Sequence, residues 1–368
     1  MRWPWQAKPS SEQLVLSWHN GELAYVLASA PVDGVMALRQ AGVIAQTGDN
    51  PDQAARPLLE LGFKGLDTTL MLSVDQYQLL QIDTPNVPPE ELRSAARYQV
   101  RDMLQTHVDD VTIDVMRVGD GRQQGSGHSF VVAAPNAEVA RVTALAQAID
   151  AQLSVIDIQE TAQRNLQNTL AQHDGVLDRA NAALVLVEGQ QAVLTISLNE
   201  ELFYTRRFDV PEGFLTAVWG QGVLAAPPEV DGFTPVQEYV PQHGGGDISL
   251  DSVFLAESAA PPNAATAPQS SVTTPNDDDD KAQRLVLEVQ RSLDVWDRTW
   301  SSLPLNRVRV FAGPRSAELA SWLTLQLGQT VTAVDIMPVF TGLEALAAAD
   351  LARCFPLLGV LLRSDALA

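Results

Sequence analysis

The stretch 183-ALVLVEGQQAVLTISLNEELFYTRRFDV-210 decides the fold. It holds three β-prone runs, 183–187, 192–198 and 202–210, separated by two polar turns. The first run is continuously apolar, as in a strand buried on both faces, whereas the third mixes apolar and polar residues, as in a half-exposed strand. The sequence therefore predicts a meander of three strands.

A fainter copy of this pattern lies near the N-terminus. Runs 14–18 and 23–28 flank the turn 19–22, and a further strand is expected near 35–38. One supersecondary unit used twice, roughly half the chain apart, indicates a duplicated domain with two lobes.

The residues between the two meanders alternate between helical and β patterns. A helix is expected over 51–61, because Asn50 can cap it, Pro51 suits its first position and Gly62 can end it. The segment 88–150 reads as helix, strand, strand, helix, and we expect it to form a compact inserted subdomain. Its elements are predicted at 89–104, 111–118, 129–134 and 139–149, with strands 70–74 and 78–83 before it and strand 153–158 and helix 160–170 after it.

Residues 241–281 break every periodicity. Glycine, proline, serine and threonine dominate until the acidic run Asp277–Asp280, so the stretch cannot bury enough apolar surface to offset ordering. We predict a disordered insertion, with the acidic run as a solubilising spacer and not a metal site.

Regular patterns return at residue 282. Apolar residues recur at helical spacing from Leu285 to Trp300, then a strand (307–311), a helix (316–327) and a strand (331–336) follow, which indicates an α/β sheet with helices on its faces. The apolar tail 341–362 is expected to close the second lobe. The expected organisation is a flexible tail (1–12), a first lobe (13–87), the inserted subdomain (88–150), a second lobe in two parts (151–240 and 282–368) and the disordered insertion between these parts (241–281).

Composition excludes several classes of function. The chain has 368 residues and a net charge of −21 at pH 7, so a phosphate backbone or an anionic lipid surface would repel it. The single cysteine, Cys354, lies among apolar residues and reads as a packed thiol, which fits a reducing compartment. No stretch has the length of a spanning helix and the N-terminus lacks a signal peptide's apolar core, so we expect a soluble, cytoplasmic protein.

Common catalytic and metal-binding motifs are missing from the sequence. One cysteine and five scattered histidines cannot build a zinc site, and there is no HExxH, Walker A or nucleophile-elbow pattern. Residues 119–125 imitate a glycine-rich dinucleotide loop, but they lie between two strands and are expected to form a hairpin tip.

Three stretches carry a resemblance to a known family: 88–103, 202–207 and 287–296. In this order and spacing, together with the two meanders and the inserted block, they resemble the actin-like PilM family of type IV pilus assembly. The resemblance is closest to the MSHA-pilus branch of that family, typified by MshI, and is shared more distantly with the cytoplasmic part of the secretion protein GspL. It implies a duplicated α/β fold of the actin and Hsp70 type.

The resemblance also implies a nucleotide cleft in which two glycine-containing hairpins grip ATP phosphates and two aspartates hold magnesium. Here Ser17 stands at the first aspartate position and His19 at its glycine. Leu186 and Glu188 replace the second pair, and the adenosine-side turn 311–314 keeps only Gly313. A leucine cannot ligate a hard cation and a glutamate would repel a triphosphate. We therefore expect a degenerate site that uses no cofactor.

The function implied is structural. The chain would bind the cytoplasmic tail of a PilN-like (MshJ-like) inner-membrane protein near the inserted subdomain and lie at the inner membrane through that partner. Arg93, Arg97 and Arg101, spaced four apart, would form a basic ridge for the tail. The ridge could instead be a solvated face pairing with Glu90 and Asp102. The alternative function is an active ATPase, in which Asp83 or Glu160 would have taken over magnesium binding.

Overall fold

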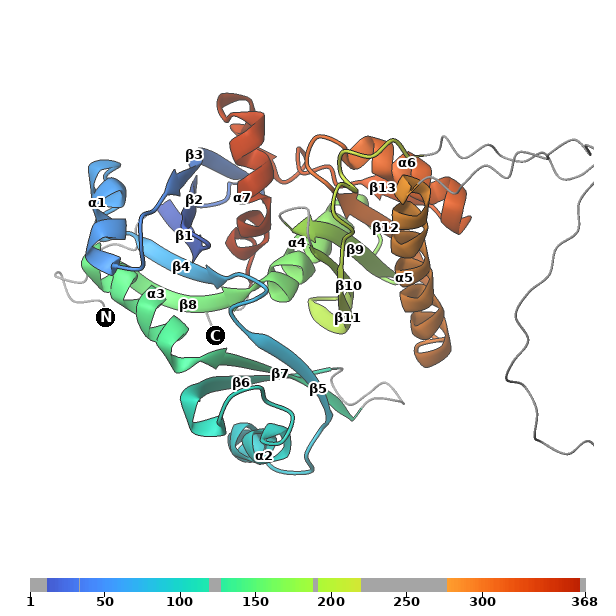
Figure 1. Ribbon diagram of the computed structural model, residues 1–368, viewed down its shortest axis with the longest axis horizontal. Helices are drawn as coiled ribbons and strands as arrows, with labels where there is room; N and C mark the ends of the chain where they lie inside the picture. The colour runs from blue at the N-terminus through green and yellow to red at the C-terminus, as the bar shows by residue number, and fades with distance from the viewer. Residues whose placement is uncertain (1–11, 33, 119–126, 188–190, 220–276, 365–368) are drawn as a thin grey trace, which may run out of the picture.

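The chain folds into two lobes and a smaller third body, and the long helix α4 (Gln159–Asp174) lies between the lobes (Figure 1). A computed structural model describes residues 12–32, 34–118, 127–187, 191–219 and 277–364. The predicted tail except Glu12, and most of the predicted insertion, therefore lie outside the described residues, as does the expected hairpin tip.

The predicted meander forms one half of the second lobe's sheet. Strands β9 (Ala180–Val187), β10 (Gln191–Leu198) and β11 (Glu201–Asp209) pair antiparallel in sequence order. Strands β12 (Leu305–Phe311) and β13 (Val331–Ala333) extend the sheet in parallel on the side of β9, so the order is β11-β10-β9-β12-β13.

The first lobe repeats this topology. Its order is β14-β3-β2-β1-β4-β8, and the five strands from β3 to β8 have the same antiparallel and parallel relations as the five strands of the second lobe. The predicted duplication is therefore present. The strands are β1 (Glu12–His19), β2 (Glu22–Ser29), β3 (Met36–Ala45), β4 (Asp67–Leu72), β8 (Gln152–Ile158) and β14 (Phe340–Thr341).

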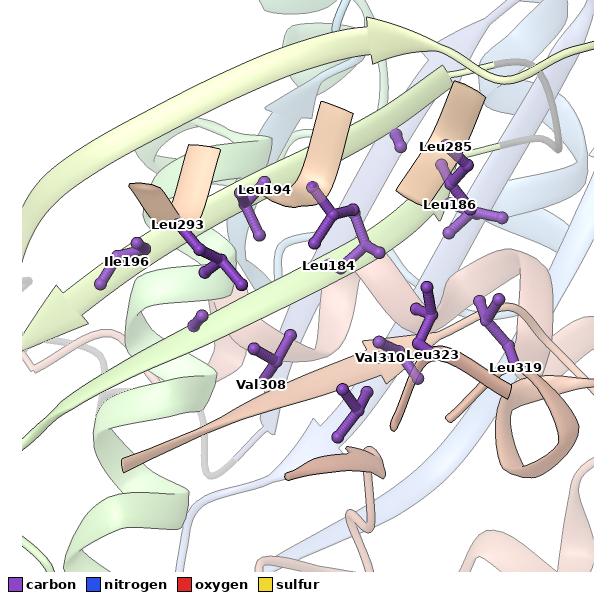
Figure 2. Close-up of a cluster of buried hydrophobic side chains, with 14 of the residues drawn as sticks. Leu184, Leu186, Leu194, Ile196, Leu285, Leu293, Val308, Val310, Leu319 and Leu323 are labelled. Atoms are coloured by element: carbon purple, nitrogen blue, oxygen red, sulfur yellow. The ribbon is translucent and has the colours of Figure 1, made fainter. Parts of the chain in front are cut away.

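Helices cover the outer face of each sheet. Helix α1 (Pro51–Glu60) begins as predicted, with the Asn50 side chain accepting from two backbone N–H groups of the first turn, and it packs with α3 (Asn136–Ala148) over the first sheet. Helices α5 (Asp277–Thr299) and α6 (Ser316–Leu327) cover the second sheet. Figure 2 shows Leu285 and Leu293 of α5 and Leu319 and Leu323 of α6 against the leucines of β9 and β10.

The C-terminal segment corrects one prediction. Helix α7 (Ala348–Leu361) packs on β1, β2 and β3, and β14 pairs with β3, so the apolar tail closes the first lobe and not the second (Figure 1). An apolar segment must be buried, but its hydrophobic pattern does not say which of two similar sheets it covers.

The inserted block also differs from its expected limits. Strand β5 (Gln78–Asp83), predicted within 13–87, pairs with β7 (His128–Pro135) in the three-stranded sheet β5-β7-β6, where β6 is Val111–Arg117. The predicted helix 89–104 is a 3₁₀ turn (Pro89–Glu91) followed by α2 (Leu92–Val100). The acidic run at 277–280 forms the start of α5 and not a spacer.

Helices α4 and α7 approach each other closely at Gly359. A Cβ atom built there would clash with the carbonyl oxygen of Ala162. The Asn165 side-chain amide donates to the Gly359 carbonyl oxygen at 3.2 Å, which fixes the crossing point. Only glycine lets these two backbones meet in this way.

We therefore predict that Gly359→Ala destabilises the fold. The added methyl forces α7 away from α4, and overpacking of this kind costs about 2 kcal/mol or more in free energy of unfolding. Urea unfolding followed by circular dichroism measures the loss. Ala349→Ser, at an exposed position of the same helix, is the control. Equal midpoints for the two variants would contradict the close approach.

Candidate functional site

A cleft of about 520 Å³ lies between the lobes. Four of the five predicted nucleotide-site positions line it, namely Ser17, His19, Leu186 and Gly313, whereas Glu188 lies outside the described residues. The structure thus brings together positions from the β1–β2 hairpin, the end of β9 and the turn after β12. The start of α4 and one face of α7 complete the wall.

The β1–β2 hairpin enters the cleft with a tight two-residue turn. Asn20 and Gly21 have φ values of 47° and 72°, which is typical of a type I′ turn. Two side-chain contacts hold the residues that flank the turn. His19 Nε2 lies 2.7 Å from Asp75 Oδ2, and Glu22 pairs with Arg353 of α7. The residues on either side of the turn are therefore tied to the segment after β4 and to α7.

Leu186, at the position of an expected metal-binding aspartate, belongs to the core of the second lobe. It is 6% exposed and lies in the same apolar cluster as Leu285 of α5 and Val310 of β12 (Figure 2). A carboxylate at this position would be taken out of water without a counter-charge.

The turn after β12 closes the opposite side of the cleft. Gly313 has a φ of 57°, and the Ser316 hydroxyl both donates to the Gly313 carbonyl and accepts from the Ala312 N–H at 2.9 Å, which starts α6. The Phe311 ring, at the cleft wall, stacks on Phe355 of α7 with ring centroids 3.5 Å apart and an interplanar angle of 7°.

Gln159 is a cleft residue that sequence reasoning missed. It is the first residue of α4 and is 2% exposed. Its backbone N–H donates to the Tyr77 hydroxyl at 3.1 Å, but its side-chain Nε2 has no hydrogen-bond partner. The sequence signal that could have identified it was its position, because this polar amide stands directly between an apolar strand and a helix.

Glu160, the candidate substitute for magnesium binding, is instead bound by Arg207 and Tyr77. It is fully buried, its Oε1 lies 2.7 Å from Arg207 Nε, and its other oxygen accepts from the Tyr77 hydroxyl. The Arg207 guanidinium also lies over the Tyr77 ring at 4.3 Å. Burial, reinforced by the Glu160 carboxylate, raises the pKa of Tyr77 well above its ordinary value, so this hydroxyl stays a donor. Because Arg207 lies on β11, the three side chains join the second lobe to the first.

Neither candidate magnesium ligand, Asp83 or Glu160, lines the cleft. Asp83 pairs with His128 in the three-stranded sheet, with Oδ1 and Nδ1 3.2 Å apart. Within the described ranges, no group of three or more His, Cys, Asp and Glu side chains is placed to hold a metal ion. The described helices also include none that is long and apolar enough to cross a bilayer.

The three arginines of the expected ridge all have acidic neighbours. Arg93 pairs with Asp114 at 2.9 Å and Arg97 with Asp109 at 3.0 Å, both beyond the helix, so Glu90 is not the partner that the solvated-face reading named. Arg101 lies 3.3 Å from Asp102, as that reading expected, and directly follows the last residue of α2. Arg97 also donates to the Val108 carbonyl and therefore fixes the turn before β6.

A second cavity, of about 480 Å³, lies beside the three-stranded sheet, between it and the segment 74–77. Edge strand β5 lines it with Gln78 and Leu80. Pro135 of β7 and Arg207 of β11 also line it. Gln78 also accepts from the Gln105 N–H at 3.1 Å, which ties the segment after α2 to the rim. We call this cavity the subdomain groove.

Comparison with known proteins places the fold. No protein-family model and no curated protein matches the sequence. Among solved structures, a PilM–PilN type IV pilus biogenesis complex matches over 97% of this chain and 100% of that chain, with a TM-score of 0.61 and 14% identity. The cytoplasmic domain of EpsL from the Vibrio cholerae type II secretion system matches over 54% of this chain and 72% of that chain, with a TM-score of 0.39 and 15% identity. With its two sheets of like topology, the chain has the actin-like fold.

We predict that Leu186→Asp destabilises the protein. The substitution removes apolar contacts with the second lobe's core and buries an unpaired carboxylate, which together cost about 3 kcal/mol or more in free energy of unfolding. Urea denaturation gives the value, and Leu186→Met, which conserves volume, should cost less than about 1.5 kcal/mol. If the aspartate variant matched the methionine variant in stability, the carboxylate would be hydrated in the cleft and the core contacts of Leu186 would contribute little.

Proposed function

We propose that this chain is a cytoplasmic structural component of a type IV pilus assembly machine of the MSHA type. It binds the cytoplasmic tail of a PilN-like (MshJ-like) inner-membrane protein and is held at the membrane by that partner. The main support is the match over 97% of the chain to a protein solved as a PilM–PilN complex. The sequence resemblance in 88–103, 202–207 and 287–296 points to the same role.

The cleft in this proposal does not hold Mg-ATP. Leu186 packs in the second lobe's core. Of the described cleft residues, Glu22 and Arg353 pair with each other, and His19 lies 2.7 Å from Asp75. The rival function, an active ATPase, needs carboxylates that face the cleft. Glu160 and Asp83 are paired elsewhere, which favours the structural role.

The tail's place in this proposal is the subdomain groove and the adjoining α2 face. Strand β5 is an edge of its sheet, and an unpaired edge can take up an extended peptide through backbone hydrogen bonds. On α2, Tyr98 is 77% exposed and lies 5.6 Å from the Arg101 guanidinium, so an aromatic and a cation are offered together. Such residues are enriched at protein interfaces.

Reversing two ridge charges tests the partner surface. We expect Arg93→Glu with Arg101→Glu to weaken binding of a synthetic PilN-like tail peptide at least tenfold, about 1.4 kcal/mol, in fluorescence anisotropy. Arg97 is left intact because it fixes the turn before β6. Arg284→Glu with Arg298→Glu, at two exposed positions on α5, is the charge-matched control. Undiminished binding by the folded double variant would move the tail elsewhere.

Calorimetry with Mg-ATP tests the degenerate cleft separately. We expect no binding at millimolar nucleotide, because the cleft offers no free carboxylate among its described residues. A dissociation constant at or below about 10 μM, on the order of −7 kcal/mol, would establish the ATPase-type site instead. The two measurements are independent, so loss of one proposal leaves the other standing.

A further inference from the structure

Tryptophan side chains in this protein are buried wherever the structure describes them. The chain has seven, and five lie in the described residues, none more than 8% exposed: Trp18, Trp219, Trp296, Trp300 and Trp322. The other two, Trp3 and Trp5, belong to residues 1–11, outside the described part. An indole presents roughly 150–250 Å² of mostly apolar surface, so both rings gain from an apolar surface within reach.

The first described strand begins at one end of the first sheet. Glu12, the first residue of β1, is paired with Ser29, the last residue of β2. Strand β3 begins at the same end with Met36, which is paired with Phe340 of β14. The ends of β1, β2, β3 and β14 therefore lie side by side, and the distance from β1 to β14 is three strand spacings, about 14 Å.

Two apolar side chains are exposed at this end of the sheet. Val32, between β2 and β3, is 72% exposed, and Met337, three residues before β14, is 65% exposed. Leu59 of α1, by comparison, is 39% exposed. Within the described residues of the first lobe, exposed apolar surface is therefore concentrated beside the point where residues 1–11 join β1.

A cation and a carboxylate accompany these two side chains. Arg39 of β3 donates from Nε to the Ser29 hydroxyl at 2.6 Å, and Asp335 accepts from the Met337 N–H at 3.0 Å. Both Arg39 and Asp335 are exposed. We call the four residues Val32, Arg39, Asp335 and Met337 the exit patch.

Residues 1–11 match the exit patch in chemistry. Trp3 and Trp5 offer apolar rings to its two exposed apolar side chains. Arg2 and Lys8 are the charged residues of this segment, which contains no acid although the whole chain has a net charge of −21. They are therefore opposite in charge to Asp335.

The arginine of the exit patch also suits an indole. In the described structure a guanidinium lies over an indole ring at two places, Arg141 over Trp18 at 4.3 Å and Arg315 over Trp219 at 3.7 Å. The face of an aromatic ring attracts a cation. Arg39 can contact a tryptophan of residues 1–11 in the same way.

The length of the segment allows this contact, and the covalent link favours it. Trp5 precedes Glu12 by seven residues, which span up to about 24 Å, against about 14 Å across the four strand ends. A short link gives the segment an effective concentration in the millimolar range at the patch. A contact with an intrinsic dissociation constant of about 0.1 mM is then occupied about ten times as often as it is empty.

From these features we propose that residues 1–11 bind to the exit patch of the same chain, with their tryptophans against Val32 and Met337. Met337 belongs to 334–339, the connection from β13 of the second lobe to β14 of the first. The bound segment thus ties the start of β1 to the chain that crosses between the lobes and restrains their relative movement. This contact is separate from the pilus partner and from the subdomain groove.

Fluorine NMR on the full chain labelled with 5-fluorotryptophan tests the contact. Trp3→Phe and Trp5→Phe assign the two resonances of the segment, and a labelled synthetic peptide of residues 1–11 gives their positions in the unbound state. We expect both resonances to be displaced from the peptide positions, because bound forms outnumber free ones by about tenfold. Resonances at the peptide positions would overturn the proposal.

Paired surface variants locate the contact. Val32→Ser with Met337→Ser should lower the ratio of bound to free forms at least tenfold and return the two resonances toward the peptide positions. The five resonances of the buried tryptophans should stay in place, which shows that the variant is folded. Leu59→Ser with Leu325→Ser, at exposed apolar positions elsewhere, is the matched control and should change nothing. Displacement that survives in the patch variant would overturn the proposed site.

Two further measurements separate other occupants of the segment. Dilution of the full chain should leave the two resonances unchanged, because the contact is within one molecule. Addition of phosphatidylcholine vesicles should also leave them unchanged. Displacement that disappears on dilution would assign the segment to a second copy of the chain, and displacement that requires vesicles would assign it to a lipid surface. Either result would overturn the proposal.

Discussion

The close approach of α4 and α7 at Gly359 is the constraint on which the two-lobed arrangement depends. Helix α4 contacts strands of both sheets, and α7 packs mainly on the first sheet, with Phe355 also stacked on Phe311 of β12. Their crossing therefore helps to set how one lobe stands against the other. It also shapes the cleft, since α4 begins with Gln159 at the cleft wall and α7 contributes Arg353 and Leu357. Gly359, which has no side chain, thus allows the two helices that border the cleft to meet.

A second bridge between the lobes is ionic. Arg207 reaches from the outer strand of the second lobe to the fully buried Glu160, and Tyr77 completes the contact. A buried ion pair contributes little net stability, but loss of one member leaves an uncompensated charge, so the pair specifies one arrangement. The two cavities are neighbours in this region, because Val74 lines both the cleft and the subdomain groove. The Val74 carbonyl also accepts a hydrogen bond from Arg207.

Sequence patterns predicted the elements well and their assembly less well. Helix α6 has the limits that were predicted, and the duplicated meander was visible because period-two and continuous apolar runs report burial directly. The predictions of which lobe α7 closes and which sheet includes β5 were wrong. Hydrophobicity does not distinguish between similar apolar faces. Four of the positions that the resemblance named line one cleft, but Gln159 escaped notice. Its interest lies in a missing hydrogen bond, which only coordinates can reveal.

The position of Cys354 has a practical consequence for measuring movement of the lobes. Its thiol is buried, lies 3.4 Å from the Gly42 carbonyl oxygen, and burial raises its pKa to about 11. At pH 7 only about one thiol in ten thousand is then ionised, and the thiolate is the reactive form. The natural chain therefore behaves toward maleimide dyes as a cysteine-free background. A fluorophore pair placed at one introduced cysteine on each lobe would report interlobe distance without first removing the native residue.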